Sequence, residues 1–258
     1  LDKVPTTHFA GADTVVARNR EYWLRINGCD PLPEISIQGE DNLAFYHGGK
    51  APVVFRDVRN RDHGQTLDDA ELAWDYLFSG VRRDASGVIT LAETRKPRKG
   101  DAFAIAIAQG KAKALVHGQL CALQQPVFMH NKLKYHGLKG DAWVRGTYFM
   151  MPAMMVAKAL HATCEQADDG LSVTLTFANG DKAQFARGSI GCVWNNEVYS
   201  MFCEAVWREG ELCLPVEWIA KRICNLQTSV SQGVLYITDH YAELSQNMAE
   251  LIRDELLS

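Results

Sequence analysis

The chain has 258 residues, of which 47% are hydrophobic and 22% are charged, and its formal net charge is −4. This composition excludes a disordered chain, and the even charge balance argues against a dedicated nucleic-acid binder. The longest apolar stretch, residues 149–162, is interrupted by Pro152 and Lys158 and falls short of the ~20 residues that a membrane span needs. The chain starts at Leu1, which predicts a processed form or part of a longer protein.

The first half consists mainly of short alternating segments separated by turns that contain Gly, Pro or Asp. Alternation with a period of two predicts strands, while the segment from Asp68 to Phe78 is either a helix or a loop. Short strands with frequent turns favour an antiparallel β-sandwich over β-α-β units, and we assign this sandwich to residues 1–125. The predicted strands are 14–17, 22–26, 34–37, 52–56, 88–91 and 103–107.

The second half, residues 126–258, contains an internal repeat. A sequence offset of 63 (215 − 152) aligns Pro152 with Pro215, Lys158 with Lys221 and Gly170 with Gly233. Each copy has a short apolar strand, a proline at the start of an amphipathic helix, and a glycine turn that leads into another strand. We therefore predict a two-repeat strand–helix–strand module, followed by an amphipathic helix over 241–257. The predicted fold class is mainly β, with an α+β second domain.

Seven cysteines stand mostly among apolar neighbours, and no Cys-x-x-Cys pair occurs. We interpret them mainly as small buried hydrophobic side chains. One or two disulfides remain open, because spacing does not reveal connectivity. Cysteine content therefore does not settle the localisation.

The motif Leu-Pro-x-x-x-Ile-Ala-Lys at 214–221, followed by Gly-x-x-x-Ile-Thr at 233–238, carries a family resemblance. With the rest of 140–240, it resembles the copper amine oxidase N-terminal-like domain, also called a stalk domain. The resemblance implies a non-catalytic, two-repeat module of the kind often attached to exported bacterial enzymes. It therefore implies a secreted or cell-surface location. Repeat one departs from the pattern, because its strand is rich in Met and its glycine turn is more acidic.

Pieces of the first half follow the order of a second family. The stretches 37–49 (Ile-Gln-Gly-Glu-Asp-Asn-Leu followed by Tyr-His-Gly-Gly) and 74–80 (Trp-Asp-Tyr-Leu-Phe-Ser-Gly) are the clearest of them. They resemble the β-sandwich that follows the helical toroid in polysaccharide lyases of the hyaluronate/chondroitin type and in heparinase-like families. The segment 80–101 is much shorter than in that family, and its aromatic strand is absent. The resemblance implies an upstream helical domain of the same protein.

A lyase of this class removes the C5 proton of a uronic acid and expels the 4-linked sugar, which requires a base, an acid and a group that neutralises the carboxylate. The resemblance implies that Glu40 supports the site as a carboxylate, and Tyr46 and His47 are residues of acid/base type on a glycine turn. Adjacent strand residues point to opposite faces, so one of the two is expected to reach a groove. The alternatives are an ordinary turn carboxylate and a surface turn.

Candidate substrate-binding residues cluster in 18–25, where Arg18, Arg20 and Arg25 surround Trp23, with Asn42 added from the lyase-like motif. Guanidinium groups pair bidentately with carboxylate or sulfate, and aromatic rings stack on sugars. The alternative is a solvated strand face with the tryptophan in the core. Between residues 82 and 113 eight basic residues face three acidic ones, which suits an anionic polymer or merely marks solvated loops.

His130 and His136 are spaced for one strand face, but no third ligand has metal-site spacing, so we predict no metal and no cofactor. The predicted function is the non-toroid part of an exported polysaccharide lyase that acts on or binds an anionic, uronic-acid glycan. Any lyase activity is expected to need the helical domain. The competing prediction is a non-catalytic cell-wall or protein-binding spacer. No nucleic acid and no membrane span is expected.

Overall fold

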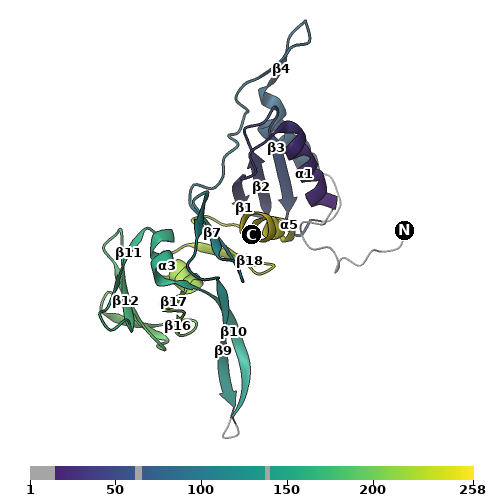
Figure 1. Cartoon of the computed structure of the whole chain (residues 1–258). Coiled ribbons are helices and arrows are strands. Elements are labelled where there is room, and N and C mark those ends of the chain that lie inside the picture. Colours follow the sequence, from purple (N-terminus) through teal and green to yellow (C-terminus); the bar gives the residue numbers. More distant parts are fainter. Residues whose placement is uncertain (1–14, 62–65, 137–139) are drawn as a thin grey trace. The chain divides into compact units, whose positions relative to one another are not determined.

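The computed structural model describes residues 15–61, 66–136 and 140–258 (Figure 1). The chain divides into two compact units, of which unit 1 comprises Leu1–Ala102 and Glu243–Leu251, and unit 2 comprises Phe103–Ala242 and Ile252–Ser258. Strands paired in antiparallel sheets make up most of the regular structure, with a few short helices. The predicted mainly β fold class is confirmed.

Unit 1 combines a three-stranded antiparallel sheet, in the order β1-β2-β3, with a separate two-stranded hairpin, β4-β5. Its elements are α1 (Val15–Asn27), β1 (Glu34–Gln38), β2 (Asp41–Tyr46), β3 (Val53–Val58), α2 (Leu67–Tyr76), the 3-10 turn η3 (Phe78–Gly80), β4 (Val81–Arg83), β5 (Ile89–Leu91) and α5 (Gln246–Glu250). The predicted strands near 34, 52 and 88 are present, and the segment predicted as either helix or loop is α2.

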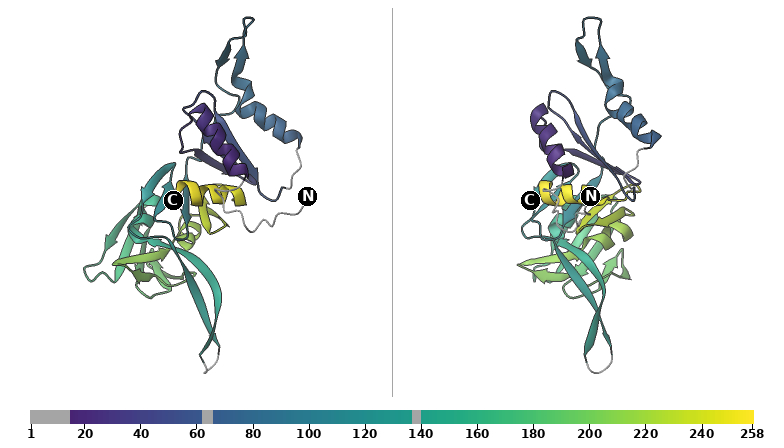
Figure 2. Two further views of the ribbon diagram at one scale, coloured as in Figure 1. Left: turned by 45° about the vertical axis from the view of Figure 1, so that its right-hand side comes forward. Right: turned by 90° about the vertical axis from the view of Figure 1, so that its right-hand side faces the viewer.

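Helices cover both faces of the three-stranded sheet (Figure 2). On one face, the ring of Phe45 in β2 lies 5.3 Å from the ring of Tyr76 in α2. On the opposite face, Phe55 in β3 lies 4.8 Å below the guanidinium of Arg20 in α1. Because β2 is the central strand and is covered on both sides, its residues after the first are buried without alternation.

The prediction of strands over 14–17 and 22–26 is wrong for every residue that the structure describes, since α1 spans this region. Thr14 lies outside the described residues. The inward face of the helix is formed by Ala17 and Arg20, which are buried, and by half-buried Leu24 and Asn27. This 3-4-3 spacing is helical, but an arginine occupies the buried stripe while Trp23 stays half-exposed.

Unit 2 contains two five-stranded sheets, ordered β18-β19-β6-β7-β8 and β11-β12-β13-β14-β15, and a four-stranded sheet ordered β16-β17-β10-β9. Its strands are β6 (Ala104–Ala108), β7 (Lys113–Val116), β8 (Gln119–Ala122), β9 (Phe128–His136), β10 (Asp141–Pro152), β11 (Ala162–Gln166), β12 (Ser172–Phe177), β13 (Lys182–Ala186), β14 (Gly191–Trp194), β15 (Glu197–Ser200), β16 (Val206–Arg208), β17 (Glu211–Pro215), β18 (Gln227–Ser231) and β19 (Val234–Thr238). Two helices, α3 (Ala153–Ala159) and α4 (Val216–Arg222), share one core with these strands.

Unit 2 is an internal duplication that is larger than the predicted repeat. The helices α3 and α4 begin at 153 and 216, which is the predicted offset of 63. Upstream of them, β6 to β9 begin at 104, 113, 119 and 128, and β13 to β16 begin at 182, 191, 197 and 206, a constant offset of 78 (182 − 104). The second offset is the larger one because the β9–β10 hairpin is longer than the β16–β17 hairpin.

Equivalent backbone hydrogen bonds confirm this correspondence. Gly110 N donates to Val127 O at 2.8 Å, and in the other copy Gly188 N donates to Ala205 O at 2.8 Å. The hairpin turns also match, because both residues of each have positive φ: His117 and Gly118 (49° and 77°) in one copy, and Asn195 and Asn196 (50° and 67°) in the other. The same strand–turn geometry is therefore built twice from sequences with few identities.

The two copies meet about a pseudo-two-fold axis and exchange strands. In the β10–β17 pairing, Met151 lies opposite Leu214, which is its own counterpart at an offset of 63. Each five-stranded sheet takes three strands from one copy (β6–β8 or β13–β15) and two from the other (β18–β19 or β11–β12). The copies are thus interleaved.

The boundary between the units differs from the predicted 125/126. The chain divides after Ala102, because β6 pairs along its whole length with β19, which lies far later in the sequence. The strands β6 to β8, which fall within the predicted first domain, therefore belong to unit 2. Because β19 lies far from β6 in the sequence, no pattern near β6 predicts that the two strands pair.

All seven cysteines are free thiols. Burial raises the pKa of Cys203 and of Cys213 to about 12, so these two stay protonated and act as small apolar side chains. In the C-terminal segment, Leu244, Met248 and Leu251 of the predicted stripe are buried, and α5 is followed by a wider helical turn over Leu251–Leu256. Within the ranges that the structure describes, no helix has the length and apolar character needed to cross a membrane.

A pair of stacked histidines in unit 2 is expected to make stability depend on pH. The rings of His117 and His161 lie 4.5 Å apart and nearly parallel, next to Phe103, and His117 Nε2 lies 3.1 Å from Ala159 O. Burial and the neighbouring imidazole lower the pKa of His117 below its ordinary 6.5, whereas the contact with the carbonyl acts in the opposite direction.

Below pH 6.5 the unfolded chain therefore binds more protons at His117 than the folded chain does, and the free energy of unfolding falls as the pH is lowered from about 7 to 5. In His117→Phe this pH dependence should be shallower. Urea unfolding followed by circular dichroism across this range measures it. An unchanged slope in the variant would show that other groups cause the dependence.

Candidate functional site

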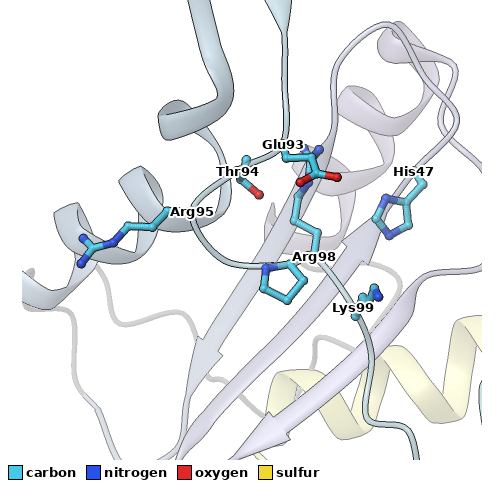
Figure 3. Close-up of a pocket in the computed structure, with 7 residues that line it drawn as sticks. His47, Glu93, Thr94, Arg95, Arg98 and Lys99 are labelled. Atoms are coloured by element: carbon cyan, nitrogen blue, oxygen red, sulfur yellow. The ribbon is translucent and has the colours of Figure 1, made fainter.

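The basic cavity of unit 1 is the candidate site. It has a volume of about 500 Å³ and is lined by His47, Glu93, Thr94, Arg95, Pro97, Arg98 and Lys99 (Figure 3). His47 directly follows β2, and the other residues belong to segment 93–99, which follows β5. Segment 93–99 has no regular secondary structure, so its position depends on specific contacts at its two ends.

A buried carboxylate anchors the first part of this segment. Asp75, at the end of α2, is 1% exposed and pairs with Arg95 Nη1 at 3.3 Å and with Lys96 Nζ at 3.0 Å. Its carbonyl accepts a hydrogen bond from Lys96 N, and Ser79 Oγ accepts one from Arg95 N at 2.7 Å. The bond from Asp75 raises the pKa of Lys96, so this cation stays charged but is already neutralised locally.

The other end is tied to β1. Gly100 N donates to Glu34 Oε2 at 2.8 Å, and a Cβ at Gly100 would approach Ile35 O to 2.9 Å, so a side chain there would push the segment off the strand. Asp101 accepts from Ser36 Oγ at 2.8 Å and from Ile37 N at 2.9 Å. Segment 93–99 is thus held at both ends, and the cavity is largely formed before any ligand binds.

Two cations in the cavity are not neutralised. Arg98 is half-buried and Lys99 is exposed, and neither forms an ion pair with a residue in the described ranges. Figure 3 shows Arg95 directed away from the other labelled side chains, whereas Arg98 extends toward Glu93 without forming an ion pair with it. The cavity therefore presents a guanidinium and an ammonium to solvent, and these groups attract carboxylate, sulfate or phosphate.

His47 adds an imidazole ring to the same wall. Its Nε2 lies 3.6 Å from Glu34 Oε1, and Glu34 also accepts the hydrogen bond from Gly100 N. The carboxylate thus links the histidine to the end of segment 93–99.

The three residues predicted to be catalytic are not brought together. Glu40 lies in the turn between β1 and β2, where it accepts from Asn60 Nδ2 at 3.3 Å, while His47 lies beyond the opposite end of β2. Five residue steps of an extended strand separate the ends of β2 by roughly 17 Å. Tyr46 is 1% exposed and belongs to the core of unit 1 rather than to the cavity.

The predicted substrate-binding residues lie elsewhere in unit 1. Arg18, Trp23 and Arg25 are exposed on α1, whereas Arg20 is buried beneath that helix against Phe55. Asn42 is fully buried in β2. Of the eight residues predicted for the site, all of which the structure describes, His47 is the only one that lines the basic cavity.

The basic run over 82–113 is visible in the sequence, but the sequence does not distinguish its paired members from the others. The useful distinction is between Arg95, which pairs with Asp75, and Arg98 and Lys99, which form no ion pair within the described part of the chain. That distinction depends on a carboxylate in a different element, α2, so no local signal carries it. Glu93 was not singled out, because only the folded position of segment 93–99 places it in the cavity.

Among the described residues, no group of three or more His, Cys, Asp or Glu side chains is arranged to hold a metal ion. His130 of the predicted histidine pair instead lies 3.1 Å from Glu204, which also pairs with Lys132 at 3.2 Å. Burial acts to raise the pKa of Glu204, but its backbone N–H, His130 and Lys132 outweigh burial and lower it to about 2.

Comparisons of the chain with known protein families, with curated proteins and with solved structures give no match.

Proposed function

We propose that unit 1 binds an anionic polysaccharide of the uronic-acid type at the basic cavity, as the non-toroid part of an exported polysaccharide lyase. The observation that carries the proposal is a pair of cations, Arg98 and Lys99, that form no ion pair with any described residue and lie on a segment fixed at both ends. Because the segment is already ordered, binding needs to order few side chains of the protein.

The chemistry of the cavity fits a repeating carboxylate. A guanidinium donates two parallel hydrogen bonds to one carboxylate, which gives Arg98 a geometric preference that Lys99 does not have. Glu93 beside Arg98 repels a second closely spaced anion and can accept hydrogen bonds from sugar hydroxyls. A uronic-acid polymer places uncharged sugar between its carboxylates, whereas nucleic acid presents a phosphate about every 1.7 Å along the duplex axis.

The proposed contribution of this chain is binding rather than β-elimination. Elimination needs an acid and a base within hydrogen-bond reach of one sugar, and Glu40 and His47 lie at opposite ends of β2. The lyase resemblance places most of the machinery on a helical domain. The proposal therefore assigns the chemical step to that domain and the holding of the polymer to the basic cavity.

Arg98→Met is expected to weaken binding of hyaluronan or heparin by at least about tenfold, because a charge-assisted hydrogen bond contributes roughly 1.5–3 kcal/mol. Lys99→Met should weaken it less, since a single ammonium provides no bidentate contact. Fluorescence anisotropy with labelled oligosaccharides at two salt concentrations measures both effects, and the affinity should fall as salt rises.

Arg83→Met is the matched control, because Arg83 is an exposed arginine of the same basic run that lies outside the cavity. It should bind like the unmodified chain. Equal losses in Arg83→Met and Arg98→Met would mean that the polymer binds through diffuse charge. Absence of binding to any of these glycans would leave the spacer function as the better interpretation.

A further inference from the structure

A second cavity in unit 1, of about 270 Å³, lies beside the basic cavity and shares Thr94 and Arg98 with it. The second cavity, called here the apolar cavity, has predominantly hydrophobic walls. They include Ala51, Pro52, Leu77, Phe78, Val81 and Leu91. A concave apolar site with one charged group at its border is the usual form of a small-molecule site.

The backbone that forms the apolar cavity is fixed by a close approach at Gly80. The carbonyl of Gly80 accepts a hydrogen bond from Ala92 N at 2.7 Å, and a Cβ at this glycine would collide with Ala92 O. The 3-10 turn η3 is thereby held against the strand end of β5. The cavity consequently exists in the unliganded chain and does not require a ligand to open it.

The walls leave apolar surface in contact with water. Phe78 is 56% exposed and Leu91 is 57% exposed. Covering such surface is favourable because it removes apolar area from water, so an apolar ligand body would be stabilised here. The walls contain few groups able to pair with sugar hydroxyls, which makes this cavity unsuitable for a polysaccharide.

The polar groups at the border select the ligand's head group. Thr94 Oγ1 donates to Lys96 O at 2.6 Å, so its hydrogen is already used. Arg98 is half-buried and forms no ion pair in the described part of the chain. A guanidinium in this position favours one carboxylate, which it can bind through two parallel hydrogen bonds.

We infer that the apolar cavity binds a small hydrophobic carboxylate, with its apolar body between Leu77, Phe78 and Leu91 and its carboxylate on Arg98. Binding of the carboxylate does not depend on the proposed polysaccharide site, but its regulatory role rests on that proposed function, because the two sites share Arg98. A ligand bound in this way occupies Arg98, so the carboxylate and the polysaccharide compete. The cavity would thus let a small acid regulate binding of the polymer.

Titration of the isotope-labelled full chain with octanoate and with octan-1-ol, followed by amide chemical shifts, tests the inference. Octanoate should produce saturable shifts at Gly80 and Ala92, and octanol, with the same tail and no charge, should bind at least tenfold more weakly. Arg98→Met should reduce octanoate binding to the level of octanol. Arg83→Met, which removes an exposed cation outside both cavities, should leave octanoate binding unchanged.

Ala51→Leu provides a second test, because it fills the apolar cavity without altering charge, and it should weaken octanoate and octanol equally. Equal binding of acid and alcohol to the unmodified chain would overturn the role of Arg98. Shifts located elsewhere, or shifts that do not saturate, would overturn the site. These outcomes are separate from the polysaccharide assay, so the failure of either proposal can be recognised on its own.

Discussion

Asn42→Ala is expected to lower the free energy of unfolding by about 3 kcal/mol, because three backbone groups lose their hydrogen bonds to one buried side chain at once. The amide Nδ2 of Asn42 donates to Glu40 O and to Glu243 O, both at 2.9 Å, and its Oδ1 accepts from Ser245 N at 2.9 Å. The residue is 0% exposed, so water cannot replace these bonds without opening the structure. Urea unfolding measures the loss.

Asn60→Gly is the matched control, since the Asn60 amide makes one bond of 3.3 Å to Glu40 at an exposed position, and glycine adopts the φ of 63° at this position without strain. Its effect should stay within about 0.5 kcal/mol. The pair of variants also tests the interpretation from sequence that Asn42 contacts substrate. Lost polysaccharide binding with unchanged stability in Asn42→Ala would support substrate contact and contradict the structural role.

Leu214→Ala should also cost about 3 kcal/mol, within the roughly 2–5 kcal/mol typical of buried leucines. Leu214 is 0% exposed and lies opposite Met151 at the pseudo-two-fold axis of unit 2. Because both side chains belong to one core cluster, the double variant Met151→Ala/Leu214→Ala should lose less stability than the sum of the single losses. Thermal and urea unfolding of the four proteins give the coupling energy.

Val198→Ala serves as the reference for an uncoupled position, because Val198 is 78% exposed on β15. It should change the free energy of unfolding by less than about 0.5 kcal/mol. Strict additivity of the two axis variants would mean that the paired strands pack independently there. That result would argue against a core shared by the two copies.

The strands near 34, 52, 88 and 103 were predictable from sequence because each alternates or forms a short apolar run between turn residues. α1 was not, since Arg20 occupies its buried stripe and Trp23 its solvent face, which reverses the hydrophobic pattern. The cation–π contact of Arg20 with Phe55 makes that burial tolerable. A residue whose partner lies on a distant strand cannot be recognised from its neighbours.

The duplication of unit 2 was likewise only partly predictable from the sequence. The offset of 63 was visible because prolines, glycines and lysines recur around the helices. The offset of 78 was not, because only Ala108 and Gly110 have identical counterparts in 104–130. Gly110 is constrained by its φ of 76°, whereas most strand positions require only a residue that fits the core. For the basic cavity, the run of basic residues was visible in the sequence, but the pairing of Arg95 with Asp75 in α2 was not.

The interleaved copies of unit 2 have the connectivity of two identical subunits whose chains have been joined into one. An assembly of identical subunits must accept every change at both positions, including those at its own axis. A joined chain is free of that restriction, which is how Met151 can face Leu214 and how one hairpin can be longer than its counterpart. The β9–β10 hairpin is therefore a part of unit 2 in which the two copies differ in structure and are able to differ in function.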